Sequence, residues 1–510
     1  MASPSPDRRA AVHRRRRVIL NDDSEVHFQG ADTPEGLLGL RLVHTVDTQV
    51  DSVFWSFIFG PENYLYDCSL HQRAGENLYP GMAKSDVERH EKICNRMRSL
   101  MDAGTDPLKV VLDFCHDLGK EMFASFRMNM IQDSWRPEFN LQFKRDHPET
   151  LLGRRGDYEH GEPDSLRAMY WSAFDYANPA VHTQRIGLID DICSRYDVDG
   201  MELDFWRWPV FFKPTLEGRP VEPEHVEQMT GFVRQVRQRM MEIEKQRGRP
   251  LLLAARALDS LEICRDLGLD FETWLRERLI DVLIVGGHYS RDAVPVAEWV
   301  KLAHQHDVPV YACFYRSRGI EMDRALAALY HAAGVDGVYT FNMFDFPKET
   351  QSFMEIGDPQ IIARKSKHYT LPGRIVDAGM AHACVDGPLP VTLVAGKPTT
   401  LTMLIADDAQ AAAEEHDLEQ IRMQLNLRSF DPRRDDVTVR VNGRKLRGRP
   451  GQFQDGIGAL TYVPFTVHTD VRKEPVVVQG ANTIDVTLGE RLSGLTAPVE
   501  LVGVAMQVKY

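Results

Sequence analysis

Eight short runs of β-branched and aromatic residues, separated by longer amphipathic stretches, constrain the fold of this chain more than any other feature. Such an alternation is typical of βα units, in which each helix crosses back over a parallel sheet. The runs cover residues 17–22, 51–57, 121–128, 200–206, 251–256, 281–286, 309–314 and 337–342. Because eight βα units close a barrel, the sequence predicts an α/β fold with a (β/α)8 barrel over residues 17–371.

An open, doubly wound sheet is the alternative for the same alternation. That fold needs a glycine-rich turn after its first strand, where a phosphate binds. The first run here instead ends in Asn21, Asp22, Asp23 and Ser24, so the barrel is favoured. Two long irregular stretches, 59–84 and 131–178, follow the second and third runs, and we expect them to be loops over the active-site face.

Both ends of the chain differ from this pattern. From about residue 373 the sequence changes to short alternating segments separated by Gly, Pro, Asn and Asp turns. This spacing predicts an antiparallel β-sandwich, a smaller accessory domain over residues 372–510. Residues 1–17 carry six arginines, and we expect residues 1–16 to be a disordered basic tail.

The chain is acidic overall, which bears on its partners. Sixty-one Lys and Arg against 74 Asp and Glu give a net charge of −13, so the surface as a whole repels nucleic acid and anionic membranes. No run approaches the roughly 18 apolar residues of a membrane helix, and no apolar segment follows the N-terminal arginines as in an export signal. The sequence therefore predicts a cytoplasmic protein that binds neither nucleic acid nor membrane, and leaves the oligomeric state open.

The sequence shows no motif that calls for a cofactor. The seven cysteines are widely spread without a C-x-x-C pair, which is unlike a disulfide framework, and we expect them to be mostly reduced. The H-x-H, H-E-x-x-H, P-loop and G-x-S-x-G motifs are absent. We therefore expect no cofactor and no dedicated transition-metal site.

The fourth run has the most acidic end, and the carboxyl ends of the strands supply the catalytic groups of such barrels. Strand alternation places Glu202, Asp204 and Trp206 on one face, directed into the barrel. Two neighbouring carboxylates in a low-dielectric site raise each other's pKa, so one can hold a proton as a general acid must. Asp204, nearer the mouth, is the predicted acid; Glu202 is either its partner or a deep residue paired with Arg127 or Arg256.

Other charged residues lie at the ends of neighbouring runs. Asp22 or Asp23, after the first run, is the best second carboxylate. Arg127, Arg207 and Arg256 end or follow the third, fourth and fifth runs. Their planar guanidinium groups suit a carboxylate or sulfate of a ligand, and they suit equally well the neutralisation of the chain's own carboxylates.

Aromatic, amide and imidazole side chains complete the predicted site. Sugars present flat apolar faces edged with hydroxyls, so aromatic planes with interspersed polar groups suit them. The same aromatic side chains also suit core packing beneath long loops. The predicted substrate-binding residues, beside the arginines, are Trp55, Asn129, Trp206, His288, Tyr289, Tyr315 and Asn342.

The run YDVDGMELDFWRWP at residues 196–209, preceded by NPAV at residues 178–181, resembles the fourth strand of bacterial glycosyl-hydrolase-like barrel proteins of the family 10-like group. The resemblance extends in strand order over most of residues 18–370, with GVDGVYTFNMF at the eighth strand. It implies a carbohydrate substrate and supports Asp204 at a functional position.

Departures from other glycosidase barrels restrict the mechanism. Chitinase-like barrels carry DGxDxDxE on this strand, and Trp206 stands here in place of their catalytic Glu, which disfavours a chitinase. Retaining barrels carry a nucleophilic Glu at the end of strand seven, where this chain has no carboxylate before Glu321. The sequence therefore leaves the nucleophile unassigned.

The leading hypothesis is a glycoside hydrolase acting on an oligo- or polysaccharide, including one with acidic sugars. Asp204 would be the general acid, and a second mouth carboxylate the base or nucleophile. Two alternatives stay open: a non-catalytic carbohydrate-binding barrel, and a lyase on uronic-acid sugars that uses His288 or Tyr315 as base. The sandwich is expected to pack against the barrel.

Overall fold

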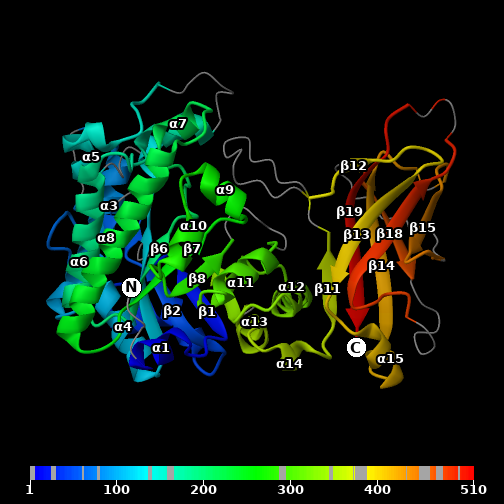
Figure 1. Cartoon of the computed structure of the whole chain (residues 1–510), viewed down its shortest axis with the longest axis horizontal. Coiled ribbons are helices and arrows are strands. Elements are labelled where there is room, and N and C mark those ends of the chain that lie inside the picture. The colour runs from blue at the N-terminus through cyan, green and yellow to red at the C-terminus, as the bar shows by residue number, and fades with distance from the viewer. Residues whose placement is uncertain are drawn as a thin grey trace.

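The computed structural model confirms the predicted (β/α)8 barrel followed by antiparallel sheets (Figure 1). It describes residues 6–24, 30–59, 63–76, 81–135, 141–157, 166–286, 294–343, 349–371, 373, 387–431, 433–446, 460–466, 475–491, 494 and 496–510. All neighbouring barrel strands are parallel, and the first pairs with the last. The barrel strands are β1 (Val18–Asp22), β2 (Val50–Ser56), β5 (Glu121–Arg127), β6 (Gly200–Asp204), β7 (Leu252–Ala257), β8 (Val282–Val285), β9 (Val310–Tyr315) and β10 (Gly337–Phe341).

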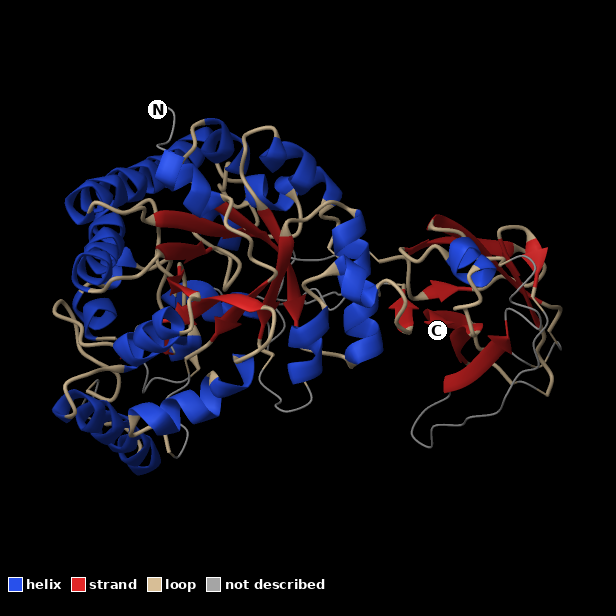
Figure 2. Ribbon diagram, turned by 90° about the horizontal axis from the view of Figure 1, so that it is seen from below, coloured by secondary structure: helices blue, strands red, loops and turns tan. Residues whose placement is uncertain are grey.

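The helices surround the strands (Figure 2). Capping side chains fix where several of them begin: Asp106 accepts from Lys109 N at the start of α4, and Asn178 from Ala180 N at the start of α6. The helices of the barrel region after the first are α2 (Pro34–Arg41), α3 (Lys84–Asp102), α4 (Pro107–Asp117), α5 (Gln142–Asp146), α6 (Pro179–Arg195), α7 (Lys213–Leu216), α8 (Pro223–Arg247), α9 (Leu261–Asp266), α10 (Phe271–Arg276), α11 (Ala297–His304), α12 (Ile320–Ala332), α13 (Thr350–Glu355) and α14 (Pro359–Ile362).

Both faces of the barrel strands are buried, as parallel sheets require. The outward face packs against the helices, as Trp55 of β2 does. The inward face forms a separate apolar cluster, to which Phe54, Phe123, Tyr339 and Phe341 contribute rings. Above this cluster the inward positions become polar, and these positions build the candidate site.

The segment expected to be a disordered tail is ordered where the structure describes it. Residues Pro6–Val12 form α1, and Val12 joins the apolar cluster inside the barrel. Arg8 pairs with Asp281 at 2.5 Å, and the fully buried Arg16 pairs with Glu121 at 2.6 Å. The prediction was wrong because some of these arginines neutralise carboxylates at the amino ends of the strands.

The C-terminal strands form two antiparallel sheets that enclose a second core. One sheet has the order β11-β19-β14-β17, with β12 also on β19, and the other β13-β18-β15-β16. Leu401, Met403 and Ile405 alternate with exposed residues along β13 and pack into this core. The strands are β11 (Lys367–Thr370), β12 (Val391–Thr392), β13 (Pro398–Ile405), β14 (Gln420–Arg428), β15 (Val437–Val441), β16 (Arg444–Lys445), β17 (Leu460–Thr466), β18 (Gly480–Leu488) and β19 (Glu500–Lys509).

The barrel and the sandwich meet where α12 lies beside β11 (Figure 1). Ala325 of α12 is buried in the sandwich core, with Leu329 packed against it. The sandwich therefore packs on the barrel through a barrel helix. Within the described ranges, no helix combines the length and apolar character that crossing a bilayer requires.

Candidate active site

A row of charged residues crosses the barrel at the carboxyl ends of three neighbouring strands. Arg127 of β5, Asp204 of β6 and Arg256 of β7 are paired in register. Two residues earlier on β6, Glu202 is paired with Ser125 of β5. Since side chains two residues apart share a face, Glu202 lies one layer below Asp204 inside the barrel.

Asp204 is held by donors from two sides. The backbone N–H of Trp206 donates to its Oδ1 at 3.0 Å, and Arg256 Nη1 lies 3.5 Å from its Oδ2. Arg256 also donates to the backbone oxygen of Gly286 at 3.1 Å and lies over the ring of Phe341, 4.4 Å from its centroid. Arg256 is therefore locked between a carboxylate, a carbonyl and a ring, and it neutralises Asp204.

Glu202 is buried among donors. Tyr339 Oη donates to its Oε1 at 2.8 Å, and both Ser125 Oγ and Asn21 Nδ2 donate to its Oε2. Burial and the nearby charge of Asp204 raise the pKa of Glu202 to about 7, although Arg256 and the donors oppose the shift. Glu202 thus holds a proton more readily than an ordinary carboxyl group.

The second arginine of the row neutralises a different carboxylate. Arg127 forms an ion pair with Asp23, which follows β1. Burial and the nearby Arg207 lower the pKa of Arg127 to about 9. Two of the three arginines predicted to face a ligand anion, Arg127 and Arg256, therefore neutralise the chain's own carboxylates.

A carboxylate that the sequence analysis did not single out lies beside this row. Asp259 follows β7 by two residues and is 4% exposed. The indole of Trp206 lies against it, but neither carboxylate oxygen of Asp259 accepts a hydrogen bond from the described residues. Trp299 Nε1 donates to its backbone oxygen at 3.2 Å. Burial raises the pKa of Asp259 to about 7, with Trp206 and Arg256 partly offsetting it. The predicted strand ended at residue 256, so extending the search three residues further would have found Asp259.

Gly286 allows the chain to pass close to this group. Its φ of 80° lies in the left-handed region, and a Cβ there would come 3.1 Å from Asp259 Oδ1 and 2.4 Å from a methyl group of Val294. A side chain at this position would displace either neighbour.

Three predicted site residues lie elsewhere, which corrects the sequence analysis. Asp22 faces away from the barrel interior and is held by Arg41, at 2.5 Å. Trp55 packs between strands and helices with no exposed surface. Asn129 is occupied by backbone groups, donating to Val210 O and accepting from Phe174 N.

Residues at the barrel mouth adopt unusual backbone conformations. Asn342, Arg316, Trp208 and Ser24 all have φ between 53° and 57°, and each follows the end of a barrel strand. Non-glycine residues of this kind gather where function imposes a conformation. Asn342 also has a buried Oδ1 without a hydrogen-bond partner.

The other predicted residues fall at the mouth or outside the description. Tyr315, at the end of β9, stacks on Phe341 with a centroid distance of 6.2 Å. Arg207 lies over the ring of Trp208, at 4.9 Å. His288 and Tyr289 lie outside the described residues. Among the described residues, no group of three His, Cys, Asp or Glu is arranged to hold a metal ion.

Comparisons with known proteins give distant structural similarity alone. No protein-family model matches the chain, and no curated protein matches it in sequence. A Paenibacillus sp. cycloisomaltooligosaccharide glucanotransferase aligns at 10% identity and TM-score 0.35; the alignment covers 97% of this chain and 57% of that one. The PgaB glycoside hydrolase domain of Bordetella bronchiseptica aligns at 11% identity and TM-score 0.41, and the alignment covers 67% of this chain and 98% of that domain. An Anoxybacillus alpha-amylase aligns at 10% identity and TM-score 0.39, and the alignment covers 94% of this chain and 99% of the amylase. Similarity at this level assigns neither a substrate nor catalytic residues.

Proposed function

We propose that this chain is a glycoside hydrolase in which Asp259 donates the proton and Asp204 is the charged partner. The observation that carries the proposal is the double contact of Trp206. Its backbone N–H donates to Asp204, and its indole lies against Asp259. The two carboxyl groups therefore share one neighbour at the ends of β6 and β7.

The surroundings of the two groups differ in the way that glycosidases need. Burial raises the pKa of Asp259 to about 7, so near neutral pH it can give a proton to the departing glycosidic oxygen. Asp204 faces a guanidinium and an N–H, both donors to a charged carboxylate. It is suited to stabilise the positive charge on the sugar or to bond to it. These roles reverse the expectation that Asp204 is the acid.

Two further features support a sugar as the substrate. The ring of Tyr315 is partly exposed at the mouth, stacks on the buried Phe341 and offers an apolar face to a pyranose. The resemblance of residues 196–209 to family 10-like barrels points to the same substrate class. Glu202, beneath Asp204, supports the site without reaching the substrate.

The test is a screen of neutral and acidic polysaccharides that records new reducing ends and the ultraviolet absorbance of unsaturated products. Asp204→Asn and Asp259→Asn are compared with wild type, and Asp102→Asn on the exposed end of α3 is the matched control. We expect reducing ends without absorbance, lost in both site variants and kept in the control. Full activity of either site variant, with its fold verified by circular dichroism, overturns the assignment.

A non-catalytic carbohydrate-binding barrel is the second candidate. The observation in its favour is that the Asp204 and Arg256 side chains are 0% and 1% exposed, as in a purely structural ion pair. Binding of a polysaccharide by wild type and by Asp204→Asn, with no product from either, would select it. A lyase is less favoured, because Arg127 and Arg256 are engaged with Asp23 and Asp204 rather than directed at a substrate carboxylate.

A further inference from the structure

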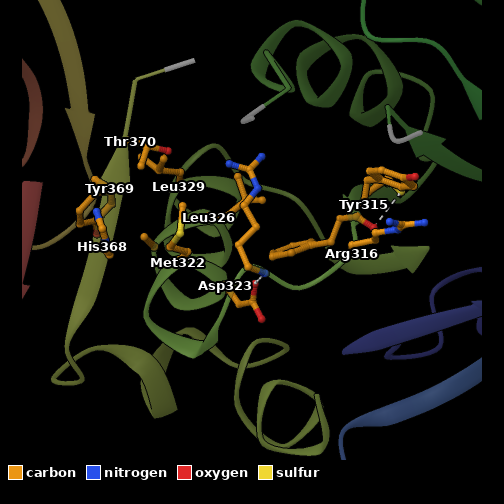
Figure 3. Close-up of a pocket in the computed structure, with 13 residues that line it drawn as sticks. Tyr315, Arg316, Met322, Asp323, Leu326, Leu329, His368, Tyr369 and Thr370 are labelled. Carbon is orange, nitrogen blue, oxygen red and sulfur yellow. Dashed lines mark hydrogen bonds between the residues drawn. The ribbon is translucent and has the colours of Figure 1, made fainter. Parts of the chain in front are cut away.

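A pocket lies between the barrel and the sandwich, next to the candidate site (Figure 3). Tyr315 and Arg316 at the end of β9 line it, together with Met322 and Leu326 of α12. His368 on β11 also lines the pocket. Both domains therefore contribute to one cavity.

The size of the cavity limits what can enter it. Its free space is about 40 Å³, and one ordered water needs roughly 10–15 Å³ on the same measure. The space suits a compact group of a few heavy atoms, such as a carboxylate or a sulfate. A whole pyranose ring would have to stay outside, at the mouth.

The charged and imidazole side chains around the cavity are two arginines, one histidine and one carboxylate. Arg316 and Arg318 are exposed at its rim, and His368 has a buried Nε2 without a hydrogen-bond partner. The nearest carboxylate in the lining, Asp323, is already occupied: Ser317, Ser352 and the backbone N–H of Arg318 donate to it, at 2.5, 2.6 and 3.2 Å. Arg318 lies close enough to Asp323, and His368 close enough to Glu321, to interact with these carboxylates, so an anion in the cavity would share the two donors with them.

Two rings connect the cavity to the row of charged residues formed by Arg127, Asp204 and Arg256. Tyr315 lines the pocket and stacks on Phe341, and Phe341 lies under Arg256, the partner of Asp204. Since Phe341 is fully buried, a sugar at the mouth would contact the partly exposed ring of Tyr315, which also lines the pocket, and a ring substituent of that sugar would point to the pocket.

We propose that this interdomain pocket is the subsite for an acidic substituent of the sugar substrate, with Arg318 of the barrel and His368 of the sandwich as donors. The inference rests on the proposed function, whose substrate class it narrows to sugars carrying a carboxylate or a sulfate. It also gives the sandwich a part in substrate recognition, since β11 supplies His368.

Binding without turnover tests the proposal. The full-length Asp204→Asn chain is titrated by calorimetry with D-glucuronate, D-glucose 6-sulfate and D-glucose. The same titrations are made after adding Arg318→Gln or His368→Gln, with Arg276→Gln at the exposed end of α10 as the matched control. Circular dichroism verifies the fold of each variant.

We expect an acidic sugar to bind and glucose to bind more weakly. Each pocket variant should bind the acidic sugar with an affinity about tenfold lower, which is the loss expected for one charge-assisted hydrogen bond. The control variant should bind the acidic sugar with unchanged affinity. Tighter binding of glucuronate or of the sulfate identifies whether the pocket binds a carboxylate or a sulfate. The proposal is overturned if neither acid binds, if glucose binds equally well, or if both pocket variants bind like the control.

The result is separable from that of the hydrolase screen. Hydrolysis of neutral polysaccharides with no binding of acidic sugars would support the proposed hydrolase and contradict the proposed anion subsite. Binding of acidic sugars that depends on Arg318 and His368, with no hydrolysis of any polysaccharide, would support the anion subsite and contradict the proposed hydrolase.

Discussion

Arg256 Nη1 lies 3.5 Å from Asp204 Oδ2, across register-paired positions of β6 and β7, and the side chains are 1% and 0% exposed. A buried pair of this kind is costly to break on one side, because the remaining charge loses its compensation. The pair therefore links the stability of the barrel to the chemistry of its mouth.

Arg256→Met should lower the free energy of unfolding of the barrel by about 3–5 kcal/mol, because it leaves Asp204 buried without its cation. Urea unfolding followed by tryptophan fluorescence measures the change. Arg276→Met, on the exposed end of α10, should change it by less than about 0.5 kcal/mol. The double variant Asp204→Asn/Arg256→Met should recover most of the loss, and a double variant no more stable than Arg256→Met would contradict this account.

Glu202→Gln should change how stability depends on pH. The pKa of Glu202 rises from 4.5 to about 7 on folding, so the native state keeps a proton that the unfolded state releases. Its stabilising contribution is present below about pH 4.5 and is lost as the pH rises through about 7. The Gln variant lacks this titration.

Between about pH 4.5 and pH 8, wild type should therefore lose up to about 3 kcal/mol of unfolding free energy more than the variant. Urea titrations at both pH values give the difference, and the exposed Glu262→Gln is the control. Parallel pH profiles for wild type and Glu202→Gln would show that Glu202 titrates normally.

Tyr339→Phe should raise the pKa of Glu202 further, since it removes the hydroxyl that donates to Oε1 at 2.8 Å. A hydrogen bond to the charged form favours that form, and its loss should shift the pKa upward by about half a unit to one unit. Carbon-13 NMR of the glutamate carboxyl groups follows the titration. Tyr196→Phe, which removes a donor to Asp106, is the matched control. A downward shift in Tyr339→Phe would refute the assigned hydrogen bond.

Arg16→Met should destabilise the barrel by about 3–5 kcal/mol, because Glu121 would stay buried without a cation. Arg15→Met changes the neighbouring arginine, which is exposed and contacts Asp358 at 3.3 Å, and should cost at most about 1 kcal/mol. Thermal unfolding of the two variants compares them directly. Equal melting temperatures would restore the picture of a dispensable basic tail.

The barrel was predictable because strand and helix periods differ so clearly along this chain. The predicted 200–206 and 251–256 runs correspond to β6 and β7, with ends shifted by one or two residues. The amphipathic stretch between the second and third runs contains two helices, α3 and α4, because the turn from Gly104 to Pro107 interrupts it.

Directions of side chains were harder to predict than positions of strands. Both faces of a parallel strand are apolar, so sequence did not reveal that Phe54 points inward and Trp55 outward. Asp22 and Asp23 are adjacent, yet Arg41 holds one outside the barrel and Arg127 holds the other at the mouth. Such pairings join residues far apart in sequence, which periodicity does not report.

The order of strands around the barrel has a consequence for synthesis of the chain. Val18 at the start of β1 pairs with Val338 of β10, so the ring closes only after nearly the whole barrel has left the ribosome. Until then β1 and β9 are open edges, and open edges recruit other strands. A messenger truncated before codon 341 would therefore yield an aggregating fragment rather than a smaller working protein, and nascent chains of this protein should depend on chaperones until β10 arrives.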